Sequence, residues 1–262
     1  METLCDIFFE FSNEDRLMIL HTLKETSLTV TSLSRELGLT TQETSRHLSR
    51  LGDAGLTRKD PEGNHHLTPY GLMSLEQLRG FRFTCSHRDY FRTHDVTRLP
   101  PEFVARIGEL EPCTYVDDVM VIFHRIEQAF KDAEEYVWRM TDRYILTAIP
   151  VMEEALQRGV EFRLLEPRDI VIPPEFDNGP ILQEALRSRQ FRNNVVDHVN
   201  VFLAISEKEV AGICFPGDDD RMDYRGFASD DPGVHGWATD LYEYYWERSE
   251  RKTALRSPPA PG

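Results

Sequence analysis

The chain has 262 residues and a formal net charge of −15, because 45 acidic residues outnumber 30 basic ones. Such an excess of acid argues against a protein that coats nucleic acid without specificity. No run of 18 apolar residues is present and the first residues lack the basic start of a secretory signal, so we expect a cytoplasmic protein with no membrane partner.

The N-terminal part predicts short helices. Residues 13–25 repeat leucines at helical spacing, and Ser12 is expected to cap this helix. A second helix is expected from about Thr31, and Gly38 is the stop.

A third helix is expected to start after Thr40 and to run to about Ala54. Thr40 followed three residues later by Glu43 is a capping box, a common start of a helix. Leu48 and Leu51 predict the side of this helix that faces the domain core.

A β-hairpin is predicted around the sequence Pro-Glu-Gly-Asn at 61–64, and Thr68 can cap a further helix from Pro69. Helix, helix, tight turn, helix and hairpin follow one another as in a winged helix-turn-helix. We therefore predict a winged helix-turn-helix DNA-binding domain over residues 10–80.

The third helix carries polar side chains opposite its leucines, and the hairpin adds basic ones. Such groups can donate hydrogen bonds to phosphate or to base edges. Residues 35–59 hold five basic residues against three acidic ones, a local charge of +2 within an acidic chain. The predicted DNA-contacting residues are Thr41, Gln42, Ser45, Arg46, Ser49 and Arg50 on the helix, with Arg58, Lys59, Asn64 and His65 in the hairpin.

The same polar face is also typical of a solvated helix, so a winged helix that binds protein without DNA specificity is the alternative. One module with few phosphate contacts should bind DNA weakly. We therefore expect a homodimer that places two recognition helices about 34–36 Å apart on double-stranded DNA.

Residues 81–100 are expected to connect this domain to a second one, with Pro100 and Pro101 at the junction. Beyond them the pattern changes to an α/β domain over 101–252, followed by a proline-rich tail at 253–262 that we expect to be disordered. The whole chain is thus predicted to be of mixed α/β class.

Within the second domain, strand-like 133–140, helical 144–159 and strand-like 160–167 predict a β-α-β unit with parallel strands. A further helix is expected at 180–189. Two strands at 199–206 and 210–216 and a last amphipathic helix at 230–250 complete the expected elements.

Open α/β sheets bind ligands beyond the carboxyl ends of their strands. This rule predicts a pocket for a small-molecule effector, although the same residues could be helix caps and surface ion pairs. Whether the domain senses a ligand or only dimerises stays open. The candidate ligand-binding residues are Thr141, Asp142, Arg143, Glu166, Arg168 and Asp231.

Three stretches carry a resemblance to known regulators. The sequence LSRELGLTTQETSRHLSRLGDAGLTRKDPEGNHHLTPYGL resembles the winged helix of archaeal ArsR-like regulators. YFRTHDVTRLPPEFVARIGEL and DDPGVHGWATDLYEYYWERSE resemble segments that flank the second domain of the archaeal methanogenesis-regulator family. The resemblance implies a DNA-binding transcription regulator.

No motif predicts a metal, a cofactor or a catalytic residue. The cysteines are scattered without a C-x-x-C pair, so they predict buried reduced thiols rather than the cysteine pairs of metal sensors: Cys5, Cys85, Cys113 and Cys214. Some archaeal regulator domains resemble phospholipase D folds, which makes a phosphodiesterase the enzyme to consider. Its His-x-Lys motif is missing, as are phosphate-binding loops and nucleophile elbows, so we expect no enzyme.

Overall fold

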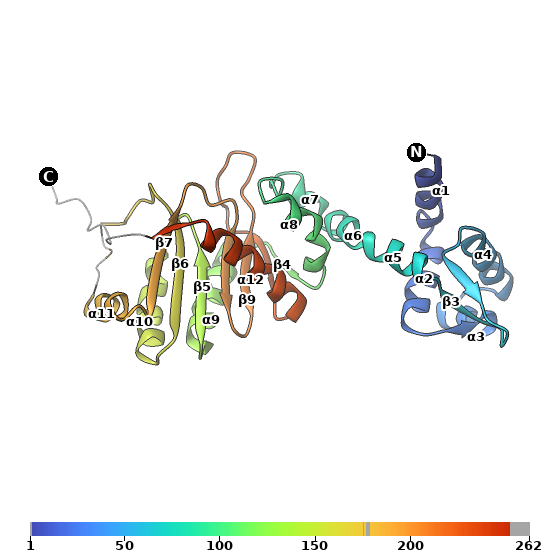
Figure 1. The fold of residues 1–262 in the computed structure, drawn as a ribbon, viewed down its shortest axis with the longest axis horizontal. Coiled ribbons are helices and arrows are strands. Elements are labelled where there is room, and N and C mark those ends of the chain that lie inside the picture. The colour runs from blue at the N-terminus through green and yellow to red at the C-terminus, as the bar shows by residue number, and fades with distance from the viewer. Residues whose placement is uncertain (1, 175, 177–178, 252–262) are drawn as a thin grey trace. The chain divides into compact units, whose positions relative to one another are not determined.

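The computed structural model describes residues 2–174, 176 and 179–251, and the proline-rich tail lies outside them. The chain divides into two compact units, Met1–Phe81 and Arg82–Gly262 (Figure 1). No helix among the described residues is long and apolar enough to cross a membrane. The described residues also hold no cluster of three or more potential metal ligands.

The first unit is a bundle of short helices with a small antiparallel sheet in the order β1-β3-β2. Its elements in chain order are α1 Glu2–Phe11, α2 Glu14–Glu25, β1 Leu28–Thr29, α3 Val30–Leu37, α4 Thr41–Asp53, β2 Thr57–Lys59, β3 Asn64–Leu67 and α5 Pro69–Gln77. This is the winged helix-turn-helix that the sequence predicts, with α1 as an additional helix that it did not predict.

Local hydrogen bonds explain where these helices start. The Thr40–Glu43 capping box is confirmed, and Thr68 Oγ1 accepts a hydrogen bond from Gly71 N at 2.9 Å. The cap predicted at Ser12 was wrong by one residue, because Asn13 Oδ1 accepts from Arg16 N at 3.0 Å.

The core of the first unit forms where the apolar sides of its helices meet. Ile19, Leu33, Leu51 and Leu56 are fully buried there. Helix α5 approaches the backbone of Leu56 so closely that a Cβ at Gly71 would lie only 2.9 Å from the Leu56 carbonyl carbon. Only glycine fits this contact without displacement of the helix.

The second unit is built on an eight-stranded sheet in the order β11-β7-β6-β5-β8-β9-β10-β4. The parallel pairs are β5 with β6 and β6 with β7, which confirms the predicted β-α-β unit, and the other neighbours are antiparallel. The strands are β4 Thr114–Val116, β5 Tyr136–Met140, β6 Glu161–Pro167, β7 Phe191–Val196, β8 Phe202–Ser206, β9 Val210–Cys214, β10 Gly226–Ser229 and β11 Glu250–Arg251.

Helices cover both faces of this sheet (Figure 1). One face packs against α9 Val119–Asp132, α10 Ile149–Gln157 and α11 Pro180–Ser188. The other packs against α12 Pro232–Glu247, α8 Pro101–Ala105 and the 3₁₀ helix η1 Ile107–Leu110. A second 3₁₀ helix, η2 Leu146–Ala148, precedes α10, which therefore starts later than predicted.

The segment expected to connect the domains is part of the second unit's core from residue 82 onward. It forms α6 Arg79–Ser86 and α7 Arg88–Phe91. Phe83, Tyr90 and Leu99 are buried against the sheet face that α12 covers. Their aromatic and leucine side chains supply the burial that makes this stretch ordered rather than a linker.

The cysteine prediction was wrong in part. Cys214 is buried on β9, whereas Cys5 and Cys85 are exposed and Cys113 is half-buried. Burial raises the pKa of the Cys113 thiol to about 12, so this thiol stays protonated.

Candidate nucleic-acid interface and effector pocket

Helix α4 has one side buried in the core and one side exposed to solvent. Thr44, His47, Leu48 and Leu51 are buried in the first unit. The capping box fixes the start of the helix and so its rotation, because Glu43 N donates to Thr40 Oγ1 at 3.2 Å and Thr40 N donates to a Glu43 carboxylate oxygen at 3.0 Å. The predicted DNA-contacting residues of the helix are all exposed: Thr41, Gln42, Ser45, Arg46, Ser49 and Arg50.

The two arginines of this exposed side differ in their surroundings. Arg46 makes no hydrogen bond or ion pair among the described residues. Arg50 donates to both carboxylate oxygens of Glu10 on α1, from Nη2 at 2.6 Å and from Nε at 3.2 Å. The Phe9 ring adds a cation–π contact, with its centroid 5.2 Å from Arg50 Cζ.

Glu10 is therefore a partner of the exposed side of α4 that the sequence pattern did not indicate. Its side chain is only 11% exposed and also pairs with Arg16 at 3.1 Å. The hydrogen bond from Arg50 lowers the pKa of Glu10, so the carboxylate stays charged at neutral pH. It lies 40 positions before Arg50 in the chain, beyond the reach of any local pattern.

The wing is the β2–β3 hairpin, closed by a network around Asp60. Asp60 accepts from Asn64 N at 2.7 Å and from Asn64 Nδ2 at 3.2 Å, and it lies 2.7 Å from His66 Nε2. The hydrogen bond to His66 lowers the pKa of Asp60 to about 2. These two hydrogen bonds to Asp60 fix the position of Asn64 in the turn.

The basic residues of the wing point outward. Arg58 and Lys59 are exposed and form no ion pair within the part of the chain that the structure describes. His65 was predicted to contact DNA, but it is buried on the inner side of β3. Burial lowers its pKa. Alternation along the strand turns His65 inward and His66 toward Asp60.

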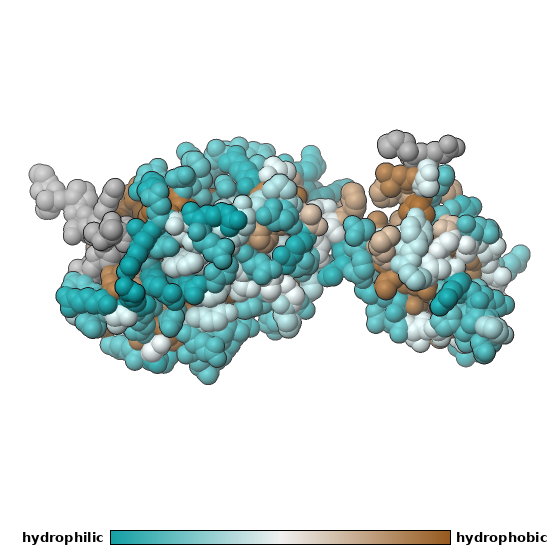
Figure 2. Space-filling view, viewed as in Figure 1, coloured by the Kyte–Doolittle hydropathy of each residue, from teal (hydrophilic) through white to brown (hydrophobic). Residues whose placement is uncertain are grey.

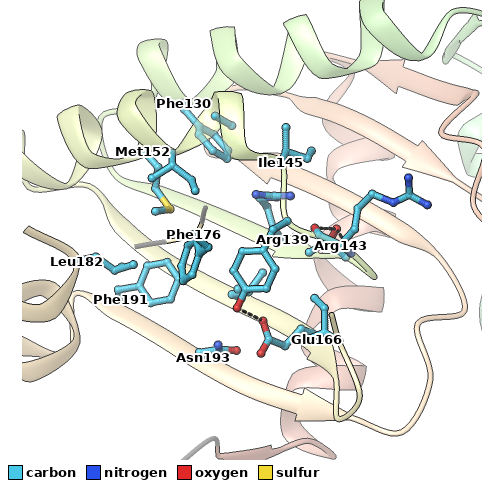
Figure 3. Close-up of a pocket in the computed structure, with 16 residues that line it drawn as sticks. Phe130, Arg139, Arg143, Ile145, Met152, Glu166, Phe176, Leu182, Phe191 and Asn193 are labelled. Carbon is cyan, nitrogen blue, oxygen red and sulfur yellow. Dashed lines mark hydrogen bonds between the residues drawn. The ribbon is translucent and has the colours of Figure 1, made fainter. Parts of the chain in front are cut away.

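In the second unit, three of the six candidate ligand residues meet at one cavity. Thr141, Arg143 and Glu166 line a pocket beyond the carboxyl halves of β5 and β6, under α10 and α11 (Figure 3). Tyr144, just after β5, donates a hydrogen bond from its hydroxyl to Glu166 Oε2 at 3.3 Å. Figure 3 shows the Arg143 side chain extending away from the other labelled residues.

The other three candidates lie outside this lining and have structural partners. Asp231 caps α12, where it accepts from Gly233 N at 2.8 Å. Arg168 forms surface ion pairs with Asp197 at 3.3 Å and Glu250 at 2.7 Å. Asp142 accepts a hydrogen bond from the Tyr224 hydroxyl.

The pocket also contains polar residues that the sequence reasoning missed, Arg139 on β5 and Asn193 on β7. A signal for Arg139 was present. It is a charged residue in a strand of a β-α-β unit, and such strands are covered on both faces. An arginine there has no solvent-facing side to occupy.

Comparisons with known proteins agree with this two-part architecture. Residues 13–59 match the family model described as "Bacterial regulatory protein, arsR family". Residues 122–248 match the model described as "Methanogenesis regulatory protein FilR1, middle domain". The two matched segments lie one in each compact unit.

Among solved structures, the chain is similar to TrmBL2, an archaeal chromatin protein, with a TM-score of 0.45 and 15% identity over 92% of this chain and 94% of that one. It is also similar to NucT from Helicobacter pylori, with a TM-score of 0.40 and 10% identity over 53% of this chain and 97% of that one. Similarity at this level assigns no activity to this chain. No curated protein matches it.

Proposed function

We propose that this protein is a transcription regulator that binds double-stranded DNA through α4 and the β2–β3 wing. The observation that carries the proposal is the division of α4 into a buried side and an exposed polar side within a module that matches the arsR family model. A helix of this kind fits the major groove, where arginine reads guanine and glutamine reads adenine. Arg46 and Gln42 are the residues that we assign to base contacts.

In this proposal the wing positions the module on the DNA backbone. Arg58 and Lys59 are exposed at the hairpin, where a winged helix meets phosphates. His65 is left out of the proposed interface because it is buried. The acidic remainder of the chain weakens non-specific binding, so these few contacts determine where the protein binds.

We further propose that the protein acts in the cytoplasm as a homodimer. The support is an exposed apolar surface on α1, where Leu4 is 51% and Phe8 is 42% exposed (Figure 2). Phe81, 60% exposed, packs edge-to-face on Phe8 with ring centroids 6.0 Å apart. Light scattering of the purified protein should give a dimer, and Phe8→Glu should shift it toward monomer.

The second unit is proposed to sense a small molecule in its pocket and to bias DNA binding through it. A ligand can do so only if its affinities for the DNA-competent and DNA-incompetent states differ. The support is the meeting of Thr141, Arg143 and Glu166 at one cavity in the region where α/β sheets bind ligands.

The DNA-binding proposal is tested by selection of bound sequences from random oligonucleotides, followed by titration with the selected site. Arg46→Ala should weaken binding to that site by about 5- to 100-fold, because one good base contact discriminates by about 1–3 kcal/mol. Arg187→Ala is the matched control, since it removes the same charge from an exposed position on α11. Equal loss in both variants, or no selected sequence, would refute the assignment.

A further inference from the structure

Arg139 is a cation buried in the middle of the large sheet. It lies on β5, is only 9% exposed, and its Nε and Nη2 atoms have no hydrogen-bond partner among the described residues. Burial lowers its pKa to about 10, although Tyr144 and Glu166 act in the opposite direction. The guanidinium is therefore still charged at neutral pH. Its Cζ atom lies 5.7 Å from the centroid of the Phe130 ring, but buried N–H groups without an acceptor are costly.

Asn193 is a second polar group without partners at the same cavity. It is 7% exposed, and neither its Oδ1 nor its Nδ2 atom is hydrogen-bonded among the described residues. Arg139 pairs in register with Leu164 on β6, and Leu164 pairs with Asn193 on β7. Residues in register share a face, so both polar groups rise from one row on the side that α10 and α11 cover.

The neighbouring row on the same face is apolar. It lies two residues earlier on each strand and consists of Val137, Phe162 and Phe191. The cavity above has a volume of about 40 Å³ and opens to solvent, and Figure 3 shows Phe176 and Phe191 beside it. Apolar walls with a few convergent polar groups are typical of small-molecule sites.

We propose that this cavity binds a small monocarboxylic acid with an apolar body, whose carboxylate accepts hydrogen bonds from Arg139 and Asn193. This inference names the effector class of the proposed regulator and rests on that proposed function.

The charges around the cavity favour this class over others. One guanidinium offers a planar fork that matches one carboxylate. The nearby Glu166 carboxylate repels a second negative charge, so phosphates and dicarboxylates fit less well. The apolar walls leave the hydroxyls of a sugar without partners, at the cost of their hydration.

The carboxylate would also lower the cost of burying Arg139. Among the described residues, its Nε and Nη2 atoms have no hydrogen-bond acceptor. Binding supplies acceptors for them, and the binding free energy is then added to the stability of the folded state.

The test is isothermal titration calorimetry on the full chain without DNA, using sodium benzoate and sodium hexanoate as probes. Benzamide, which has the shape of benzoate but no charge, and inorganic phosphate are the comparison compounds. We expect at least one of the two acids to bind, and benzamide and phosphate to bind at least about tenfold more weakly, as the loss of one charged hydrogen-bonded pair implies.

Three variants test whether Arg139 and Asn193 contact the acid. Arg139→Met should weaken binding of the acid by about 10- to 100-fold. Arg192→Met is the matched control, because Arg192 is next to Asn193 on the opposite side of the same strand and should leave binding unchanged. Asn193→Leu should weaken binding to a smaller degree, and it carries the test if circular dichroism shows that Arg139→Met does not fold.

The proposal is overturned if neither acid binds with a dissociation constant below about 10 mM, which corresponds to a binding free energy of about −3 kcal/mol. It is also overturned if benzamide binds as well as benzoate, or if Arg139→Met and Asn193→Leu bind like the wild type. DNA binding is measured separately and without acid, so a failure of the DNA proposal would be seen independently of this result.

Discussion

The contact between Glu10 and Arg50 leads to a prediction about DNA affinity. Glu10→Gln removes the charge that holds Arg50, while it keeps the size of the side chain. Arg50 would then be available for a phosphate. One further phosphate contact steepens the slope of log K against log salt by about 0.9, and a tenfold gain in affinity corresponds to about 1.4 kcal/mol. We expect a gain of about 3- to 10-fold at low salt.

The same substitution should weaken the fold. Glu10 and Arg16 are 11% and 8% exposed in their side chains, so their pair is shielded from water. Loss of the carboxylate leaves the buried Arg16 without its counter-charge, which we expect to cost about 1–3 kcal/mol. Thermal unfolding followed by circular dichroism measures this cost.

The assay is fluorescence anisotropy on the selected DNA site at several salt concentrations. Asp15→Asn is the matched control, because it removes one negative charge from α2 without a contact to Arg50. A double-mutant cycle with Arg50→Ala separates the two effects. Arg50→Ala should matter little in the wild type and should abolish the gain in Glu10→Gln. Equal changes of affinity and slope in Glu10→Gln and Asp15→Asn would show that the Glu10–Arg50 contact does not control DNA binding.

Two further predictions concern the stability of the winged helix. Gly71→Ala should destabilise it, because the new Cβ would overlap the Leu56 backbone, whereas Gly52→Ala in α4 meets open space and should gain about 0.5–1 kcal/mol from helix propensity. Chemical denaturation of both variants checks this, and the same sign for both would contradict it. Because His66 lowers the pKa of Asp60, the stabilisation by this carboxylate should be complete above its ordinary pKa and be lost as the pH falls toward about 2. A carboxyl NMR titration should show the low pKa, and His66→Ala should raise it; an unchanged value in that variant would exclude the His66 contact as its cause.

Interactions between neighbours in the chain are enough to place several of the elements. The Thr40–Glu43 box, the Thr68 cap and the positive φ of Gly38 are local hydrogen-bond or backbone requirements, and they place α3, α4 and α5. The spacing of Leu48 and Leu51 likewise decided which side of α4 is buried. The exposed polar side followed without tertiary information.

The long-range partners of these residues, in contrast, follow from the packing of the helices and the sheet. The ion pair between Glu10 and Arg50 depends on how α1 packs, and that packing brings together positions 40 residues apart. The β-α-β pattern indicates that Arg139 is covered, but the residues around it depend on which helices pack on that face of the sheet. On β5 it lies on the side opposite Trp138 and Met140, and α10 and α11 cover that side. Alternation in a strand defines two sides, but long-range packing determines which side chains surround each of them.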